Sequence, residues 1–425
     1  PRDRLIARHF IPIPYEACSV RHPDAVCWPG LYLESAIEEG EDDDLVIILI
    51  HAHPGGLFAF SDLDDESDRT TITALLQAYG ARHGTAIMTP SGAIRARLYD
   101  ASGSPSPVDL VTVAGDDLHF WWHDQTGLAG PNPRPIAFTG SMTTELSRLH
   151  AIIIGVSGTG SIEAEQAARL GFGRVTLIDF DRVEGKNLNR ILNSTVADAD
   201  GGRLKVEMFA DAITHYRGPG VSVPIGTSIN TRDAVVAGSQ GDVLFCCVDT
   251  LEARFYADLI AAAFLLPLFD TGVVIPVRRD GDRVAIADAV GRIDYVQPGG
   301  ATLGDRGVYS AETLRGEYLR KVAPDAHVQE VEAGYLKGIV EEAPAVISLN
   351  MRAASACMNE FILRAYPFRL DPNSNYARTR FSLAGSDEDI FSEDDFKVSP
   401  NRILGRGATE PLLGLPALGL RKGLG

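Results

Sequence analysis

The chain has 425 residues, of which 45% are hydrophobic and 23% charged, and 39 Lys and Arg against 57 Asp and Glu give a formal net charge of −18. This length exceeds one ordinary core and predicts two or three domains, while the composition excludes a chain that is disordered overall. No apolar run approaches the roughly 20 residues that cross a bilayer, and the negative charge opposes nucleic acid, so we expect protein and nucleotide partners.

The first third of the chain predicts an α/β unit. Leu45–Ile50 is a continuous apolar run, typical of a buried strand, and the turn-like His53-Pro54-Gly55-Gly56 follows it. A helix is expected near Ser61–Tyr79, a strand near Ala86–Pro90, and further strands towards Trp121. The acidic stretches Glu38–Asp44 and Ser386–Asp395 are expected to be solvated loops.

The central part predicts a doubly wound parallel sheet. Gly127–Pro135 is rich in Gly and Pro and predicts a linker. After it, apolar strand patterns alternate with helical patterns, which indicates parallel βα units. The expected strands are Ala151–Val156, Val175–Asp179, Val243–Val248 and Leu266–Asp270, and the first expected helix is Ser161–Leu170.

The end of the first apolar strand carries a candidate metal site. His51 and His53 are two residues apart, so their side chains share one face and can converge on one ion. Ser61 and Asp64 follow near the start of the expected helix, and Asp64 offers an oxygen ligand. Catalytic zinc sites use three protein ligands and leave one position open, a count that these residues meet. The alternative is a turn whose histidines merely cap the strand.

The pattern His-x-His-Pro-x6-Ser-x2-Asp resembles the signature of JAB/JAMM (MPN+) metalloproteases. The resemblance implies an MPN-like α/β zinc domain in which His51, His53 and Asp64 bind Zn²⁺ and Ser61 stabilises the developing oxyanion.

Such peptidases also need a general base, a glutamate that usually lies well upstream of the histidines. Only fifty residues precede them here, Leu5–Phe10 predicts a strand entering the domain, and Pro1 is not a natural start. We therefore expect that the base has been cut away. Glu16 is the best remaining candidate, since Glu34 and Glu38 lie closer to an acidic stretch.

A candidate nucleotide site begins at residues 152–161, which read Ile-Ile-Ile-Gly-Val-Ser-Gly-Thr-Gly-Ser. A strand, a glycine-rich turn and a helix in this order point backbone N–H groups at phosphate. The candidate loop residues are Gly155, Ser157, Gly158 and Gly160, although Ser157 stands where G-x-G-x-x-G has its second glycine. Asp179, after the next strand, can bind a ribose hydroxyl. Up to this point a dehydrogenase would also fit.

The continuation separates these alternatives. Asp181, Asn187, Arg190, Lys205 and Asp249 follow in order along the chain. Hydride transfer has no need of such a cluster, whereas adenylation needs cations on a triphosphate and a carboxylate for Mg²⁺. The remaining alternative is a Rossmann domain with scattered surface charges.

This order resembles the ThiF/MoeB/ubiquitin-activating family, with its glycine loop, D-x-D, N-x-x-R, lysine and late Asp. The resemblance extends from about Ile152 to the expected helix Val346–Arg364. It implies a site for ATP and Mg²⁺ and the catalytic residues Arg190, Lys205 and Asp249. The implied roles are ribose binding by Asp179, β/γ-phosphate binding by Asn187 and Arg190, α-phosphate binding by Lys205, and metal binding by Asp249.

The five cysteines do not form an evident disulfide framework, which suits a reducing cytoplasm. Relatives that proceed beyond the adenylate carry a nucleophilic Cys in a loop after the last core strands, but the corresponding loop Gln297–Gly304 has none. Cys246, Cys247 and Cys357 fall in apolar elements and are expected to be packed as small hydrophobic side chains. Direct transfer of the acyl group, or a cysteine on a conjugating partner, would then be needed.

The expected organisation is α/β throughout: a zinc peptidase domain (1–123), a linker (124–139), a doubly wound ThiF/MoeB-like adenylation domain (140–370) and a C-terminal extension (371–425). Such a fusion resembles bacterial ubiquitin-like modification modules. It would adenylate the C-terminal glycine of a ubiquitin-like protein, which the peptidase trims or removes. The alternatives are activation of a ThiS/MoaD-like sulfur carrier and a degenerate binding scaffold. A homodimer is expected from the resemblance.

Overall fold

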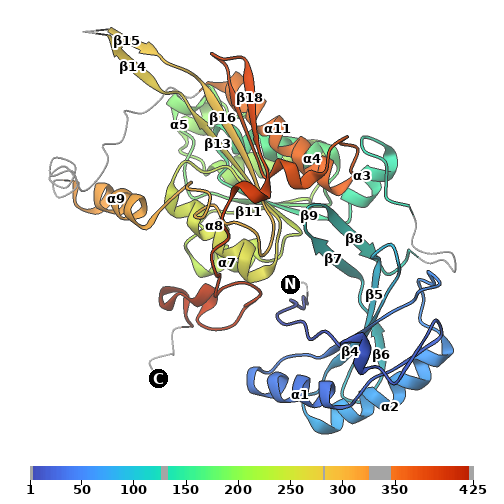
Figure 1. Cartoon of the computed structure of the whole chain (residues 1–425). Helices are drawn as coiled ribbons and strands as arrows, with labels where there is room; N and C mark the ends of the chain where they lie inside the picture. The colour runs from blue at the N-terminus through green and yellow to red at the C-terminus, as the bar shows by residue number, and fades with distance from the viewer. Residues whose placement is uncertain (1–2, 126–132, 281–282, 325–345, 421–425) are drawn as a thin grey trace. The chain divides into compact units, whose positions relative to one another are not determined.

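The structure is a computed structural model that describes residues 3–125, 133–280, 283–324 and 346–420 (Figure 1). These residues form two compact units. The smaller contains His9–Val113 and Leu118–Arg134, while the first eight residues and Ala114–Asp117 belong with the C-terminal part of the chain in the larger. Most of the expected glycine- and proline-rich linker, residues 126–132, lies outside the described residues.

The smaller unit is built on a four-stranded sheet of order β3-β4-β5-β6, in which β3 is parallel to β4 and the other pairs are antiparallel. Ile47, Ile72, Leu75 and Tyr99 form a core between this sheet and its helices. The elements are η1 (Tyr15–Ala17), β1 (Val20–His22), β2 (Ala25–Cys27), α1 (Leu31–Asp43), β3 (Ile48–Ala52), α2 (Asp62–Ala78), β4 (His83–Met88), β5 (Ile94–Tyr99), β6 (Pro105–Pro107), β7 (Leu110–Ala114) and β8 (Leu118–Trp122).

Buried Asp68 fixes α2 to this sheet. One of its carboxylate oxygens accepts hydrogen bonds from Thr85 Oγ1 (2.6 Å), from Arg97 Nη2 (2.7 Å) and from the hydroxyl of Tyr99 (2.7 Å). Asp68 lies one turn beyond Asp64, on the same side of the helix. The network therefore also sets the position of Asp64 relative to β3.

Three expectations for local structure were wrong. Residues 5–10 form no strand. The acidic run Glu38–Asp44 is not a loop, because α1 continues to Asp43, with Leu33, Ala36 and Ile37 on its inner side packed against the core. Nor is Ser386–Asp395 a loop, since it contains β18, where Asp389 pairs across the strands with Arg380 at 2.6 Å. Tertiary packing and cross-strand pairing decide these segments against their charge.

The larger unit has the expected doubly wound sheet, in the order β11-β10-β9-β12-β13-β16-β17-β18. The first five strands are parallel and the last three antiparallel. Its elements are α3 (Gly140–Leu146), β9 (His150–Ile154), α4 (Gly158–Leu170), β10 (Arg174–Ile178), η2 (Gly185–Asn187), α5 (Val196–Asp200), α6 (Lys205–Arg217), β11 (Ser222–Ile225), α7 (Arg232–Gly238), β12 (Val243–Cys246), α8 (Leu251–Phe264), β13 (Leu268–Val274), β14 (Val277–Asp280), β15 (Arg283–Ile286), β16 (Val290–Val296), α9 (Ala311–Val322), α11 (Ile347–Ala365), η3 (Asn373–Tyr376), β17 (Arg378–Ser382), β18 (Asp387–Phe391), η4 (Glu393–Asp395), η5 (Leu412–Gly414) and η6 (Pro416–Leu418).

Alternating residues of the central strands build two separate cores. Ile152, Ile154 and Leu244 pack against α7 and α8, and Leu412 and Leu413 of the C-terminal segment join them. On the opposite face, Phe245 and Phe269 stack at 5.5 Å between ring centroids, and Phe361 of α11 contacts both rings at 5.9 Å. Two buried faces explain the continuous apolar runs of a parallel sheet.

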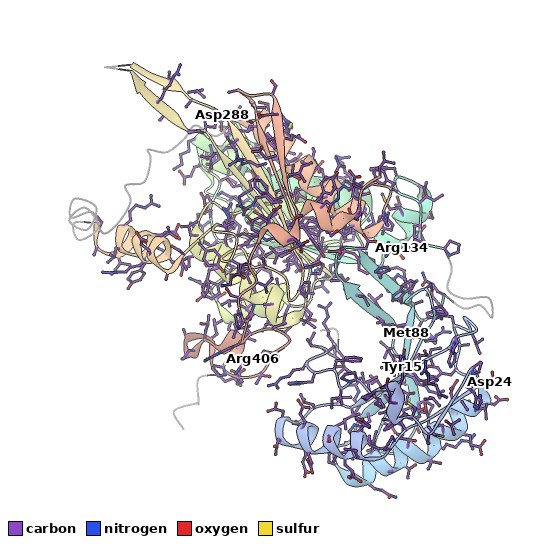
Figure 2. The ribbon with its side chains drawn as sticks, viewed as in Figure 1. Tyr15, Asp24, Met88, Arg134, Asp288 and Arg406 are labelled. Atoms are coloured by element: carbon purple, nitrogen blue, oxygen red, sulfur yellow. The ribbon has the colours of Figure 1, made fainter. Side chains whose placement is uncertain are left out.

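Side-chain hydrogen bonds, in addition to the backbone hydrogen bonds between strands, stabilise the antiparallel end of the sheet. Asp288, labelled in Figure 2, lies between β15 and β16. Its carboxylate accepts hydrogen bonds from Ser382 Oγ (2.7 Å) and from the backbone N–H of Ala384 (3.0 Å), at the turn that joins β17 to β18. Residues 371–425, expected as an extension, thus add two strands to the main sheet. Within the described residues, no helix has the length and apolarity that a bilayer crossing requires.

We predict that Arg364, fully buried in α11, is a major source of stability for the larger unit. Its guanidinium donates to Glu360 (2.7 Å) and to the backbone carbonyls of Asp116 (2.6 Å) and Tyr376 (2.7 Å). Arg364→Ala removes the donor to both carbonyls and one of the two arginines that pair with Glu360, the other being Arg369, and should cost about 3–5 kcal/mol. Amide hydrogen exchange of α11 measures that loss.

The matched control on the same helix is Arg352→Ala. Arg352 is 41% exposed and pairs with Glu388 at 3.0 Å, so its removal should cost less than about 1 kcal/mol. Equal protection of α11 in both variants would contradict the assignment.

Candidate nucleotide and metal sites

The glycine-rich loop joins β9 to α4 at the carboxyl edge of the parallel strands. Gly155 has φ +84°, and a Cβ there would lie 2.9 Å from Val248 Cγ1 and 3.0 Å from the carbonyl oxygen of Cys247. A Cβ on Gly160 would lie 1.7 Å from the carbonyl oxygen of Gly155. Only glycine fits these two positions, because the loop is pressed against the segment after β12.

Asp179, at the end of β10, fixes the loop from the other side. Its carboxylate accepts hydrogen bonds from the backbone N–H of Val156 (2.7 Å) and of Asp181 (2.8 Å). Burial raises the pKa of Asp179 above its ordinary value, although Lys205 and these hydrogen bonds oppose the shift. The sequence suggested a ribose contact for this acid and gave no sign of its second task, which is to hold the loop.

Two cations lie near the same edge. Lys205, at the start of α6, is buried and its Nζ donates to Asp181 at 2.7 Å. Arg190 donates to the carbonyl oxygen of Lys186 (2.9 Å) and has no acidic partner within the described part of the chain. Its side chain contacts the loop, because a Cβ on Gly158 would lie 3.3 Å from Arg190 Cδ.

The two remaining predicted residues flank these cations. Asn187 is buried in η2, where its Oδ1 accepts from the backbone N–H of Glu184 at 3.1 Å. Asp249 is exposed after β12, just before α8 begins, and makes no ion pair with any described residue. The loop thus contacts both Arg190 and the segment that leads into Asp249. A glycine cradle, an unpaired cation and an exposed carboxylate fit a nucleoside triphosphate with Mg²⁺.

In the smaller unit, the three predicted metal ligands converge at the end of β3. Nε2 of His51 and Nε2 of His53 are 3.1 Å apart, and the Asp64 carboxylate reaches the first with Oδ1 (2.9 Å) and the second with Oδ2 (3.3 Å). Tetrahedral zinc with bonds of about 2.0–2.1 Å holds neighbouring ligand atoms about 3.3 Å apart. The spacing of the three groups therefore fits Zn²⁺.

Neighbouring groups orient these ligands. Nδ1 of His53 lies 2.9 Å from the carbonyl oxygen of Leu57, which holds the proton on Nδ1 and leaves Nε2 for a metal. The next carbonyl, that of Phe58, accepts a hydrogen bond from buried Arg95 at 2.8 Å, so Arg95 steadies this loop. This role could not be predicted from the sequence, because Arg95 lies on β5, two strands away from His51 in the sheet.

Ser61 caps α2 through reciprocal hydrogen bonds with Asp64. Ser61 Oγ donates to the Asp64 carboxylate at 2.8 Å and accepts from the Asp64 N–H at 3.3 Å. Burial raises the pKa of Asp64, but these hydrogen bonds and the two histidines outweigh burial and keep it below its usual range. Helix capping explains the Ser-x-x-Asp spacing by itself. The convergence of both histidines on the same carboxylate does not follow from capping.

The candidate bases differ in position. Glu16 is exposed in η1, and Glu34 and Glu38 lie on α1. Among the described residues, no glutamate joins the cluster of His51, His53 and Asp64.

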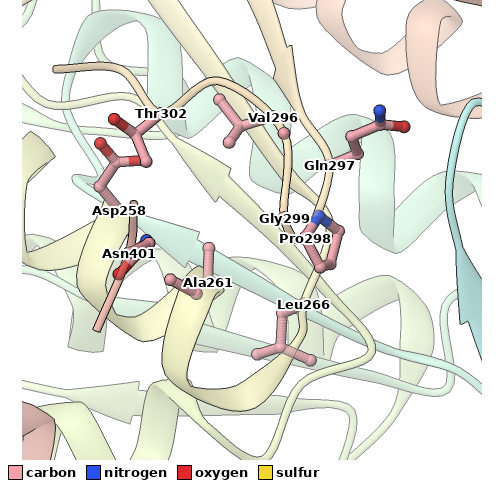
Figure 3. A pocket seen from close by; sticks show the side chains of 11 residues that line it. Asp258, Ala261, Leu266, Val296, Gln297, Pro298, Gly299, Thr302 and Asn401 are labelled. Atoms are coloured by element: carbon pink, nitrogen blue, oxygen red, sulfur yellow. The ribbon is translucent and has the colours of Figure 1, made fainter. Parts of the chain in front are cut away.

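A separate hollow lies at the amino edge of the large sheet, where Leu268 pairs with Val296 (Figure 3). Asp258 lines it, accepts a hydrogen bond from the hydroxyl of Tyr309 (2.6 Å), and has its pKa raised to about 7 by burial. None of the predicted site residues lines this hollow. The predicted nucleotide-binding residues lie instead around the opposite, carboxyl edge.

The features at that edge define a class of protein. A doubly wound α/β unit with a glycine-rich loop at a helix N-terminus is the architecture of nucleotide-binding proteins. The model of the ThiF family matches residues 134–351, just over half of the chain. The chain belongs to the ThiF family.

Among curated proteins, the chain is 34% identical over 134 residues to ubiquitin-like modifier-activating enzyme 5 of Drosophila persimilis, covering 28% of this chain and 34% of that protein. It is 28% identical over 159 residues to the enzyme of the same name from Caenorhabditis elegans, covering 35% and 34%. The chain thus spans about a third of the length of these relatives. A structure of Escherichia coli MccB with ATP aligns with 62% of this chain and 69% of its own, at 15% identity and a TM-score of 0.46.

We predict that three of the five cysteines resist alkylation in the native protein. Cys246, Cys247 and Cys357 are buried, and burial raises the pKa of each thiol, which lowers the thiolate fraction. Iodoacetamide at pH 8 should modify exposed Cys27 and half-buried Cys18 and reach the others only after unfolding. Mass spectrometry of tryptic peptides locates the adducts.

The same burial predicts that no stable thioester forms on these thiols. Incubation with ATP and a ubiquitin-like protein should give no thiol-sensitive adduct on a non-reducing gel. An adduct that disappears in Cys246→Ala or Cys247→Ala would contradict this prediction.

Proposed function

We propose that the larger unit adenylates the C-terminal glycine of a ubiquitin-like or sulfur-carrier protein. The observation that carries the proposal is the placement of the glycine loop against both unpaired Arg190 and the segment leading to Asp249. Membership of the ThiF family and the likeness to ubiquitin-like modifier-activating enzymes support it.

In the proposed reaction, the carboxylate of the glycine attacks the α phosphorus of ATP, an acyl–O–P bond forms, and the bond to pyrophosphate breaks. Arg190 and Lys205 offset the charge that develops on the phosphates, and Asp249 and Asn187 hold Mg²⁺ and the β/γ phosphates. Asp179 binds the ribose. No proton transfer is required, so the residues act by position and charge.

We propose that the smaller unit is a zinc peptidase acting on the same partner, with an MPN-like fold. The convergence of the two imidazole nitrogens and the Asp64 carboxylate supports this part of the proposal. Zinc bound there would act as a Lewis acid on the scissile carbonyl. The carbonyl oxygen of Leu57 holds His53 in its ligating tautomer through a hydrogen bond. The hydroxyl of Ser61, which donates to Asp64 in this structure, would turn to donate to the developing oxyanion.

The adenylation proposal predicts ATP–pyrophosphate exchange that depends on a carrier protein ending in glycine. Asp249→Ala should abolish the exchange because Mg²⁺ loses its ligand. Arg190→Ala should lower it at least about tenfold, since a charge-assisted contact contributes roughly 1.5–3 kcal/mol. Radiolabelled pyrophosphate incorporation into ATP is the measurement.

Two exposed residues provide matched controls. Asp211 lies on the exposed side of α6 and Arg169 is 60% exposed on α4, so alanine at either position should leave the exchange unchanged. Full exchange in Asp249→Ala would remove that residue from the site. No exchange with any glycine-terminated carrier would favour a binding scaffold.

The peptidase proposal predicts near-stoichiometric zinc with slow cleavage. Zinc content, measured by mass spectrometry of the metal, should fall to background in His53→Ala and Asp64→Asn. It should persist in Asp62→Asn, which changes an exposed acid on the same helical turn. Cleavage of a ubiquitin-like fusion should be slow, because no described glutamate joins the three ligands. Rapid cleavage that Glu16→Gln abolishes would instead make Glu16 the base.

A further inference from the structure

Asn350 is a buried polar residue that no motif of the sequence singled out. It lies in the first turn of α11, where its backbone N–H donates to the carbonyl oxygen of Val346 at 3.1 Å. The residue is only 5% exposed, and its side-chain amide has no hydrogen-bond partner within the described residues. An amide that no group of the described chain engages can donate to a bound ligand.

The amide points at the start of α4. A Cβ on Gly158 would lie 2.3 Å from Nδ2 of Asn350 and 3.3 Å from Cδ of Arg190. The two side chains therefore approach the same loop residue, whose lack of a side chain permits the contact. Gly158 is the first residue of a 13-residue helix, whose free N–H groups favour an anion.

The position of Asn350 is fixed by the packing of α11 against α4. Gln166 of α4 donates a hydrogen bond from Nε2 to Ser355 of α11 at 2.8 Å. Phe361, further along α11, packs on Phe172, which follows α4, at 5.4 Å between ring centroids. The amide is thus held beside the loop by rigid elements.

We propose that the side-chain amide of Asn350 binds a phosphate oxygen of the nucleoside triphosphate. It acts as a donor beside the loop N–H groups and Arg190. The inference rests on the proposed function, because it requires that ATP occupies this loop. It adds a binding residue from α11, which is separate from the glycine loop, the D-x-D pair and the N-x-x-R segment. The amide N–H can donate to a phosphate oxygen. Because that oxygen carries charge, the hydrogen bond is stronger than one between two neutral groups.

The test is the binding of Mg²⁺–ATP and of adenosine to the full chain, measured by isothermal titration calorimetry. Asn350→Asp keeps the shape of the side chain and places a carboxylate against the phosphates. It should weaken ATP binding by about tenfold or more and leave adenosine binding within about twofold. Asn350→Ala should weaken ATP binding in the same direction, with adenosine again unaffected.

Ser355→Ala is the matched control, because it removes the α4–α11 hydrogen bond without touching the loop. If Asn350 acted only through packing, Ser355→Ala would also weaken ATP binding, and the Asn350 variants would lose affinity for ATP and adenosine alike. Either result overturns the inference. Wild-type ATP affinity in Asn350→Asp overturns it as well. An unmodified chain that binds ATP but shows no pyrophosphate exchange defeats the proposed adenylation and leaves this assignment standing, whereas failure to bind ATP defeats both.

Discussion

The carboxyl edge of the large sheet depends on how closely the glycine-rich loop approaches the segment after β12. Gly155 has no room for a Cβ, and the Asp179 carboxylate holds the loop through the N–H of Val156. These contacts set the position of the helix N-terminus of α4 and of the residues around it. Arg190 and Asp249 become candidate binding residues because they lie beside this loop or the segment it contacts. Elsewhere on the protein, each would be an ordinary surface charge.

Buried polar groups perform a similar task in both units. Asp68 ties α2 to β4 and β5 and so places Asp64, while Arg364 joins α11 to backbone carbonyls at residues 116 and 376. Each charged group is surrounded by several partners, which offsets the cost of removing it from water. The candidate sites are therefore positioned by interactions between elements far apart in the chain.

The two candidate sites differ in how much chemistry the side chains themselves supply. At the nucleotide loop, the proposed reaction would need only charge and position, because adenylyl transfer to a carboxylate moves no proton. At the cluster of His51, His53 and Asp64, the proposed hydrolysis would require a base as well as three ligands. The described residues bring the ligands together and leave Glu16 on the surface of η1. The MPN-like assignment of the smaller unit therefore stays a prediction.

The sequence by itself determined the local signals. Apolar runs gave the parallel strands, Ser61 marked the start of α2, and the spacing of His51, His53 and Asp64 identified residues that meet in space. Tertiary structure alone decided the rest. The acidic residues of α1 and β18 led to a wrong prediction of loops. Packing of Leu33 against the core and pairing of Arg380 with Asp389 outweigh the preference of these acidic residues for water. The second role of Asp179 and the contact of Asn350 with Gly158 also required the fold, since neither spacing nor residue type reveals which distant backbone atoms a buried side chain will meet.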